Sequence, residues 1–558
     1  MRLSAAQPLA LRLRGQSSEG KPSGSRPGSA AVAREDRRSA PVWPALLVCL
    51  ALAGLTLLLP STPTYDPWAW IMWGREIGQL DLETTGGPSW KPLPVMFTTV
   101  FSLLGSDVAP YLWLWVARAG GMFAVVMAFR LARRLTGGGV AGAVAGVATG
   151  AFLLTSYQFA RDAALGNSEP MLAAIALWAI ERHLDGRRDH ALYLGFAAAL
   201  LRPEAWPFIG AYGLWLWFRE PELRLRVAAV GLLIPVLWFG PELWGSGDAL
   251  RASTRANDPN PGSAAFAAHP GLEVAYRFHE RTIWPLELGA LIASVYAAVK
   301  SIKGRHRPPL QPDDVKGGHR PPLQPPSQRA VLFLLGAGLG WLALVAIMTE
   351  QGYAGNQRYL IVTTAAICVL GGIGFGRIFA GIRAAATRLA GSPRRGLAVA
   401  CAVFLAGLAA LTPVIKDKVD NMEVTAEKLE YEASLWGNLP EAIEKAGGRD
   451  RLLRCGSVYS GPFQTQMIAY ELGVHGFEVE ALVPTEPPGV AFQTHTVRDG
   501  PLVTDVTDDR FRTVATRSRW RVLTVPRSDA AGRECPAAGP DAARVAPREV
   551  TPELVSSR

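Results

Sequence analysis

Charged side chains are scarce in this chain, because Asp, Glu, Lys and Arg make up 19% of its 558 residues, against about 25% in an ordinary globular protein. Cysteine is also scarce: five residues without a Cys-x-x-Cys pair exclude a disulfide-rich scaffold and a zinc ribbon. The eight histidines show no metal-ligand spacing. The chain has no Gly-x-x-x-x-Gly-Lys phosphate loop, no His-Glu-x-x-His and no Gly-x-Ser-x-Gly. These absences remove the usual motifs of nucleotide, zinc and serine chemistry.

Hydrophobic residues make up 49% of the chain, the mean hydropathy is +0.16, and the apolar residues are gathered into long blocks. A helix needs about 20 mostly apolar residues to cross ~30 Å of hydrocarbon. The blocks therefore predict a mostly α, polytopic membrane protein with about eleven transmembrane helices, several of them short enough to be tilted or broken. The predicted spans are 41–60, 110–135, 139–157, 170–183, 191–203, 205–218, 227–244, 286–300, 330–349, 359–382 and 396–415.

Basic residues predict the orientation of these spans. The arm 1–41 is polar and rich in Arg, so we expect it to be disordered. We also expect it to be cytoplasmic, because positive charge that flanks a first span keeps that flank on the cytoplasmic side of the membrane. Alternation then places five more basic segments on the cytoplasmic side, namely 130–134, 182–188, 219–226, 300–307 and 377–395. We expect a multi-pass protein of the bacterial plasma membrane, partnered by the lipid bilayer. The net charge of +10 is dispersed through short loops, which argues against nucleic acid.

The spans define a transmembrane domain over 42–415, in which 61–109 is the first outer loop. The loop 303–328 is a cytoplasmic linker that contains a duplication, because Gly304-Arg-His-Arg-Pro-Pro-Leu-Gln-Pro312 is nearly repeated at 318–325. Proline of this density favours an extended linker. A docking peptide for a proline-binding module is the functional alternative, and a linker without a partner is the simpler one.

The tail 416–558 is long enough for a small domain and has a C-terminal end expected to be disordered. Its helix-like and strand-like stretches alternate, which predicts a small extracytoplasmic α/β domain. Cys455 and Cys535 fall in this domain, where oxidising conditions allow a disulfide between them. The other three cysteines lie within spans and are expected to be packing residues.

The first outer loop carries the densest set of polar and aromatic residues. Asp66 lies a few residues after the first span, where a partly desolvated carboxylate can act as a general base toward a hydroxyl. The alternative is that Asp66 caps a helix that begins at Pro67. The tryptophans of this loop, including Trp68, Trp70 and Trp73, are expected to be interfacial anchors.

Three further groups of charged residues fall at outward-facing span ends. Arg161, Asp162 and Glu169 precede the fourth span, and Glu169 can either orient a substrate or metal or cap the helix that follows. Arg202-Pro203-Glu204 interrupts an apolar helical pair, either lining a cavity or forming a plain turn.

The last group, Gly355-Asn-Gln-Arg358-Tyr359, lies at the outer mouth of the tenth span. Together with Lys91 and Arg202 it places three cations on one side of the membrane, and these can hold a phosphate or pyrophosphate. For Arg358, a snorkelling arginine is the alternative.

The order of these motifs resembles the GT-C superfamily of integral membrane glycosyltransferases. The likeness lies in Asp66 after the first span, the Lys91-Pro-Leu-Pro stretch, Glu169, Arg202-Pro-Glu and Arg358-Tyr-Leu. Within the superfamily, the chain looks like the polyprenyl-phosphate-sugar-dependent branch that includes protein mannosyltransferases and lipid A aminoarabinose transferases. The resemblance covers roughly residues 42–415.

The resemblance implies a GT-C-like fold and transfer of a hexose or pentose from a polyprenyl-phosphate donor to a hydroxyl of a glycan, lipid or protein at the outer face. Asp66 matches the presumed base, and Glu169 matches the family's second acid. Lys91, Arg202 and Arg358 match positions near the lipid phosphate. The remaining residues expected to orient substrate are Arg161, Asp162, Glu204 and Tyr359.

The chain departs from the family at two points. Asp66 is followed by Pro67, where many relatives have an acidic pair, and Lys91-Pro-Leu-Pro replaces a double proline. A single acid is a poorer divalent-ion site, so no cofactor is assigned and the need for a metal stays open. The rival functions are a polytopic transporter and a non-catalytic cell-envelope binding protein. Charges at span ends, without two matching halves, argue against the transporter.

Overall fold

A computed structural model describes residues 40–305, 327–525 and 535–536. The chain divides into Met1–Pro41 and Val42–Arg558, and the second unit is described below. Nearly all of the predicted arm 1–41, nearly all of the linker 303–328 and the C-terminal end of the chain lie outside the described residues.

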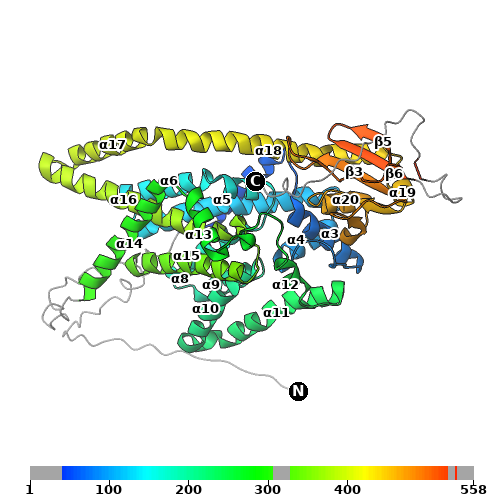
Figure 1. Cartoon of the computed structure of the whole chain (residues 1–558). Helices are drawn as coiled ribbons and strands as arrows, with labels where there is room; N and C mark the ends of the chain where they lie inside the picture. Colours follow the sequence, from blue (N-terminus) through cyan, green and yellow to red (C-terminus); the bar gives the residue numbers. More distant parts are fainter. Residues whose placement is uncertain (1–39, 306–326, 526–534, 537–558) are drawn as a thin grey trace, which may run out of the picture. The chain divides into compact units, whose positions relative to one another are not determined.

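The unit is mostly helical, with a helical bundle followed by a small C-terminal sheet (Figure 1). In chain order the helices are α2 (Trp43–Thr56), α3 (Tyr65–Gln79), α4 (Pro92–Ser102), α5 (Ala109–Thr136), α6 (Gly139–Leu154), α7 (Tyr157–Ala164), α8 (Glu169–Leu184), α9 (Arg188–Ala199), η1 (Pro203–Ala205), α10 (Trp206–Arg219), η2 (Pro221–Leu223), α11 (Arg224–Ser246), α12 (Arg251–Ala256), η3 (Ala264–Phe266), α13 (Pro270–Arg281), α14 (Trp284–Arg305), α15 (Ser327–Glu350), η5 (Gln357–Leu360), α16 (Ile361–Ala390), α17 (Pro393–Ala410), α18 (Thr412–Lys445), α19 (Arg449–Leu453), α20 (Thr465–Leu472) and η6 (Gly476–Glu478).

The described residues contain six helices that are long and apolar enough to cross a membrane, or seven if the bent pair α6 and α7 is one span. The chain is therefore a multi-pass membrane protein, but the predicted count of eleven is not confirmed. Each predicted block does contain a helix, and the shortfall is in length. For example, α2 and α10 have 14 residues each and α9 has 12. At 1.5 Å per residue, such helices are shorter than ~30 Å of hydrocarbon.

Glycines let the central helices of the bundle approach closely. The backbone of Gly374 in α16 lies against that of Gly289 in α14, so a Cβ atom at Gly374 would collide with the Gly289 carbonyl oxygen. Gly372 is packed in the same way against Thr149 of α6. Small residues at helix interfaces serve this purpose in membranes, where packing replaces the hydrophobic effect between helices. The helix α16 is thereby enclosed by its neighbours.

The C-terminal domain contains a six-stranded mixed sheet with the strand order β2-β1-β3-β6-β5, and β4 pairs with β3. Its strands are β1 (Ser457–Tyr459), β2 (Val479–Glu480), β3 (Gly489–His495), β4 (Leu502–Val503), β5 (Arg512–Arg517) and β6 (Trp520–Val525). The strands β1, β2 and β3 are parallel, whereas β3, β6 and β5 are antiparallel. The helices α18 and α20 cover one face through a core that includes Leu435, Ile468 and Phe492.

A disulfide joins Cys455, which precedes β1, to Cys535, 80 residues later. Of the other three cysteines, Cys49 and Cys368 are buried and Cys401 is exposed on α17. The sequence predicted that all three are packing residues. This prediction is wrong for Cys401, because its side chain is not buried against other residues of the chain. The helix α18 begins at Thr412 and continues to Lys445, so it crosses the boundary predicted at residue 416.

The tryptophans of segment 61–109 are core residues, and the prediction that they anchor the chain at the membrane interface is wrong. Trp68, Trp70 and Trp73 are at most 2% exposed. Trp68 packs edge-on against Trp436 of α18, with the ring centroids 5.0 Å apart. Trp68 is buried because the C-terminal domain packs on α3, whereas Trp70 and Trp73 pack against Trp113 and Trp90. The pattern of this segment alone does not reveal these contacts.

We expect the substitution Gly374→Val to destabilise the bundle, because the new side chain must push α14 away from α16, and overpacking of this kind costs about 1–3 kcal/mol. The measurement is thermal unfolding of the purified protein in detergent, and a lower Tm is expected. Gly381→Ala is the matched control, since Gly381 lies on the same helix with no atom near its added Cβ. Equal effects of the two substitutions would contradict this packing.

Candidate active site

Polar side chains from seven segments meet at the end of the bundle that contacts the C-terminal domain. We call them the polar cluster, and its members are Asp66, Lys91, Glu169, Arg202, Glu204, Tyr353, Arg358 and Tyr359. Asp66 lies in the first turn of α3, Lys91 directly precedes α4, and Glu169 is the first residue of α8. The other members come from the α9–η1 turn, from η1, from the loop after α15 and from η5.

The carboxylate of Glu169 is the centre of the polar cluster. Its Oε1 atom accepts hydrogen bonds from Lys91 Nζ at 3.2 Å and from Arg202 Nη1 at 2.6 Å. Arg358 Nε lies 4.0 Å from the same oxygen. The other oxygen, Oε2, is buried and has no hydrogen-bond partner among the described residues. One carboxylate oxygen therefore faces three cations.

Arg202 is fixed on all sides. Its guanidinium binds Glu204 through two hydrogen bonds, of 3.0 Å and 2.6 Å, and lies 3.7 Å from the ring centroid of Tyr359. The Tyr353 hydroxyl accepts from Arg202 and donates to Glu204 Oε1 at 2.8 Å. Burial alone would raise the pKa of Glu204, but Arg202 outweighs it and holds that pKa below its ordinary value. The pair is therefore ionised and rigid.

Lys91 contacts Ser168 and the face of Trp70 in addition to Glu169. Burial lowers the pKa of Lys91, and the neighbouring Glu169 only partly offsets this effect. The lysine is thus held in a dry position in which its charge is balanced by Glu169.

Arg358 and Asp66 form the part of the polar cluster that solvent reaches. Arg358 Nη2 donates to Asp66 Oδ2 at 2.8 Å, and the two side chains are 22% and 10% exposed. The side chains of Lys91, Arg202 and Glu169 are 7% exposed or less. A ligand that arrives from solvent therefore meets Arg358 and Asp66 first.

A second layer holds Arg358. Its Nη1 atom donates to Asn167 Oδ1 at 3.3 Å, and Asn167 donates in turn to Asp162 at 2.9 Å. Gln158 donates to the other oxygen of Asp162. Asp162 is therefore one residue removed from the cluster, on the side of α7.

The structure brings most of the predicted site residues together and leaves one apart. Arg161 Nη2 donates to Glu432 of α18 at 2.8 Å, and among the described residues it forms no hydrogen bond or ion pair with the polar cluster. Asp66 is not the helix cap considered as an alternative, because α3 begins at Tyr65 and Thr64 is the N-cap. Sequence reasoning missed Tyr353, which lies in a short loop and carries no motif.

The first loop and the C-terminal domain are joined by contacts along α3. Arg75 donates to the carbonyl oxygens of Tyr470 and Val474, both at 3.1 Å. The buried carboxylate of Glu76 contacts His475 Nδ1 at 2.9 Å, and Asp81 lies 3.5 Å from His475 Nε2. Because Asp66 is on the same helix, these contacts fix its position from the far end of α3.

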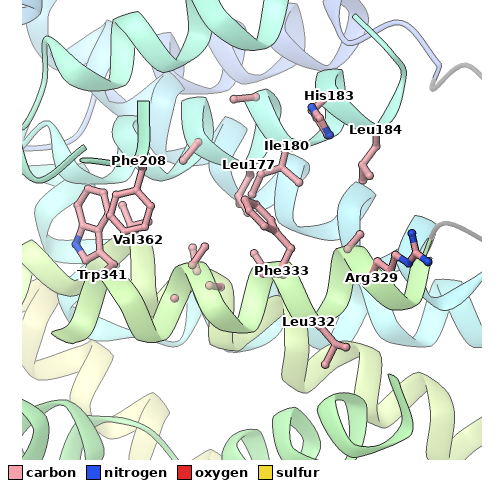
Figure 2. Close-up of a pocket in the computed structure, with 18 of the residues that line it drawn as sticks. Leu177, Ile180, His183, Leu184, Phe208, Arg329, Leu332, Phe333, Trp341 and Val362 are labelled. Carbon is pink, nitrogen blue, oxygen red and sulfur yellow. The ribbon is translucent and has the colours of Figure 1, made fainter. Parts of the chain in front are cut away.

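A cavity of about 2130 Å³ begins beside the polar cluster and extends between α8, α9, α10, α14, α15 and α16. At the near end it is lined by Phe208, Trp341 and Val362 (Figure 2). Trp341 donates to the backbone oxygen of Tyr359 at 2.8 Å. The polar cluster and an apolar cavity therefore share a wall. Among the described residues, no group of three His, Cys, Asp or Glu is arranged to hold a metal ion.

Comparison with known proteins gives few matches. No protein-family model and no curated protein matches the chain. Among solved structures, it is similar to ArnT from Cupriavidus metallidurans bound to undecaprenyl phosphate, with 15% identity, coverage of 90% of this chain and 100% of that chain, and a TM-score of 0.48. It is also similar to ArnT from Cupriavidus metallidurans in the apo state, with 14% identity, coverage of 92% of this chain and 100% of that chain, and a TM-score of 0.47. Likenesses of this size assign the chain to no family, so its function has to come from its own residues.

We expect Glu169→Gln to destabilise the protein strongly, because it leaves Lys91, Arg202 and Arg358 with less buried negative charge. Removing one partner of a buried ion pair costs about 3–5 kcal/mol. Thermal unfolding in detergent measures the loss, and Glu222→Gln, at an exposed position in η2, is the control. An unchanged Tm for Glu169→Gln would show that Glu169 does not compensate these charges.

The contact between α3 and the C-terminal domain is expected to weaken as the pH rises. Burial raises the pKa of Glu76 from 4.5 to about 7. Burial acts to lower the pKa of His475, but the hydrogen bond to Glu76 and the nearby Asp81 raise it above 6.5. Both pKa values are higher in the folded state. The contribution of Glu76 to stability is therefore fully present below pH 4.5 and is lost as the pH rises through about 7, and that of His475 is present below pH 6.5 and is lost at higher pH.

Hydrogen exchange of residues 70–81 and 465–478 measures this effect, and faster exchange is expected at pH 8 than at pH 5.5 after correction for the intrinsic rate. Glu76→Gln should reduce the pH dependence, whereas Glu480→Gln, exposed on β2, should leave it unchanged. The same pH dependence in all three proteins would exclude Glu76 as its source.

Proposed function

We propose that the chain is a membrane glycosyltransferase that moves a sugar from a polyprenyl-phosphate donor to an acceptor hydroxyl, with Asp66 as the general base. The observation that carries the proposal is the pair of Asp66 and Arg358 at the accessible edge of a buried cluster of charges. This arrangement puts a proton acceptor and a phosphate-binding group side by side, as group transfer from a phosphate requires.

The reaction divides between the two members of this pair. The acceptor hydroxyl gives its proton to the Asp66 carboxylate while its oxygen forms a bond to the anomeric carbon. The bond from that carbon to the phosphate oxygen breaks, and its electron pair leaves with the phosphate. Arg358 binds the phosphate and stabilises the charge that develops on it. Attack from the face opposite the leaving phosphate inverts the anomeric carbon.

The ion pair of Asp66 with Arg358 implies an order of binding. While Arg358 donates to Asp66, the guanidinium occupies the Oδ2 atom of the carboxylate. A donor phosphate that takes the guanidinium withdraws it from Asp66 and frees the carboxylate. The base is then active only when the donor is bound, which protects the donor from premature reaction.

Lys91 and Arg202 act behind Arg358. Their positive charges are held by Glu169 and Glu204, so they add to the local potential without having to move. Glu204 and Tyr359 keep Arg202 in place, and Asp162 supports Arg358 through Asn167. Arg161 is paired with α18 and has no role in this scheme.

The apolar wall of the cavity supports a lipid-linked donor. Phe208 and Trp341 are stacked with centroids 5.4 Å apart, and Trp341 is bonded to the backbone of Tyr359. The first prenyl units of a donor held at Arg358 reach this wall. A soluble enzyme that uses a nucleotide-sugar donor does not need an apolar wall of this kind, because its donor has no lipid chain.

The orientation follows from the basic cytoplasmic loops. We place the N-terminus in the cytoplasm of a bacterial cell and the polar cluster and C-terminal domain outside, so that transfer takes place at the outer face of the plasma membrane. The acceptor is a hydroxyl of a glycan, lipid or protein. No metal is needed for this scheme, because cations of the chain itself neutralise the phosphate.

We expect Asp66→Asn to leave the protein folded and to reduce transfer by about 10²–10⁴-fold, the usual contribution of a general base. The measurement compares cell-envelope glycans and lipid-linked sugars in cells without the protein and in cells complemented with each variant. Wild type should restore a glycan component and consume a lipid-linked sugar, whereas Asp66→Asn should not.

Asp107→Asn is the matched control, because Asp107 is an exposed acid in the same predicted loop. Size-exclusion chromatography in detergent shows whether each variant is folded. Wild-type-like complementation by Asp66→Asn would overturn the base assignment. Identical envelopes with and without the protein, together with uptake of a solute in proteoliposomes, would favour the transporter instead.

A further inference from the structure

The cavity beside the polar cluster has a second end of opposite character. Four of its lining residues are basic, namely Lys300, Lys303, Arg329 and Arg377. The residues that line it in the described part of the chain include no Asp or Glu. We call these four residues the basic end. The rest of the lining is almost wholly apolar or aromatic.

Helix ends bring these cations together. Lys300 and Lys303 lie in the last turns of α14, and Arg329 lies in the first turn of α15. Arg377 lies 4.6 Å from the ring centroid of Tyr296, and Lys300 lies 5.8 Å from the same ring. Arg377 also donates to the backbone oxygen of Leu135 at the end of α5.

The two ends of the cavity lie on opposite sides of an apolar middle section. In Figure 2, Phe208, Trp341 and Val362 lie at one end and Arg329 at the other, with Leu177 and Phe333 between them. The basic end is therefore separated from the polar cluster by the length of the apolar section. It belongs to a different site.

We propose that the basic end binds the phosphate headgroup of an anionic phospholipid, whose acyl chain lies in the apolar section of the cavity. Its charge is complementary to a phosphate, and basic pockets between transmembrane helices hold anionic headgroups. The volume of about 2130 Å³ is twice the upper end of the usual ~300–1,000 Å³ for small ligands. An anionic phospholipid has a charged headgroup followed by hydrocarbon chains, and the cavity has a basic end followed by an apolar section.

The cations of the basic end differ in position from the positive charges that only set the orientation of a membrane protein. Positive residues near helix ends are usual on the cytoplasmic side of any membrane protein, and Arg394 and Arg395 at the start of α17 are of that kind. Those two do not line the cavity. The basic end instead faces a cavity large enough for a lipid chain. The two sets of cations therefore predict different lipid binding.

The test uses the full-length protein in detergent with photoactivatable phosphatidylglycerol, whose label is on the acyl chain, and mass spectrometry of the crosslinked peptides. We expect crosslinks in residues 177–184 and 332–341, competed by unlabelled phosphatidylglycerol and not by phosphatidylcholine of the same chains. Lys300→Gln combined with Arg329→Gln should lower the affinity by roughly 30-fold, from the loss of two cations.

Arg394→Gln combined with Arg395→Gln is the matched control and should bind as wild type does. A second variant, Ala176→Phe, keeps every cation and places a ring in the lining of the cavity. It should lose the same crosslinks if the acyl chain enters. Thermal unfolding shows that each variant is folded.

Three outcomes would overturn the proposal: equal labelling of both double variants, equal competition by phosphatidylcholine, or crosslinks outside the cavity. Displacement by polyprenyl phosphate with no effect of phosphatidylglycerol would also overturn it, since the cavity would then belong to the donor alone. Lipid labelling does not depend on sugar transfer, so failure of the proposed function leaves this test unaffected.

Discussion

The structure of the candidate site depends on the charge balance at Glu169. This carboxylate is 1% exposed and faces Lys91, Arg202 and Arg358, which come from three different segments. Buried charges are tolerated only when they are paired and hydrogen-bonded. The need to balance these cations therefore fixes the start of α8 against the start of α4, the α9–η1 turn and η5. The arrangement of the helix ends follows from this electrostatic requirement as much as from apolar packing.

The C-terminal domain completes the site from the other side. Asp66 is at the start of α3, and the far half of that helix is bound by Arg75 and Glu76 to the segment around His475. Trp68, two residues from Asp66, packs against α18. The helix that carries the proposed base is thus held between the bundle and the sheet. The domain acts as a structural part of the site, in addition to any contact that it makes with an acceptor.

The sequence predicted the members of the polar cluster better than it predicted the helices that carry them. Alternation of spans puts charged residues at the same membrane face, and charges that are costly in lipid must meet one another. That argument needs only the order of the spans, so it gathers Asp66, Lys91, Glu169, Arg202 and Arg358 correctly. It does not depend on whether a block forms a helix of 14 or of 20 residues.

Other features could not be predicted because they depend on tertiary contacts. A tryptophan beside a span looks the same in the sequence whether lipid or another domain covers it, and here α18 and α20 cover Trp68. Tyr353 carries no pattern at all, since its place between Arg202 and Glu204 depends on the loop after α15. The sequence predicted the sheet only in part, because β4 and β6 depend on pairing with β3, and β5 depends on pairing with β6.

The gradient of exposure within the polar cluster explains how such a site can be both stable and reactive. Lys91, Arg202, Glu169 and Glu204 are buried and mutually neutralised, so their positions cost little to maintain once the bundle is folded. Arg358 and Asp66 share one ion pair at the solvent edge, where exchanging one partner for a phosphate requires only a local change. A preorganised interior then supplies potential without reorganisation, and only the outer pair has to respond to substrate. Placing the reactive pair at the interior of the cluster would reverse this advantage, because each exchange would expose an unpaired buried charge.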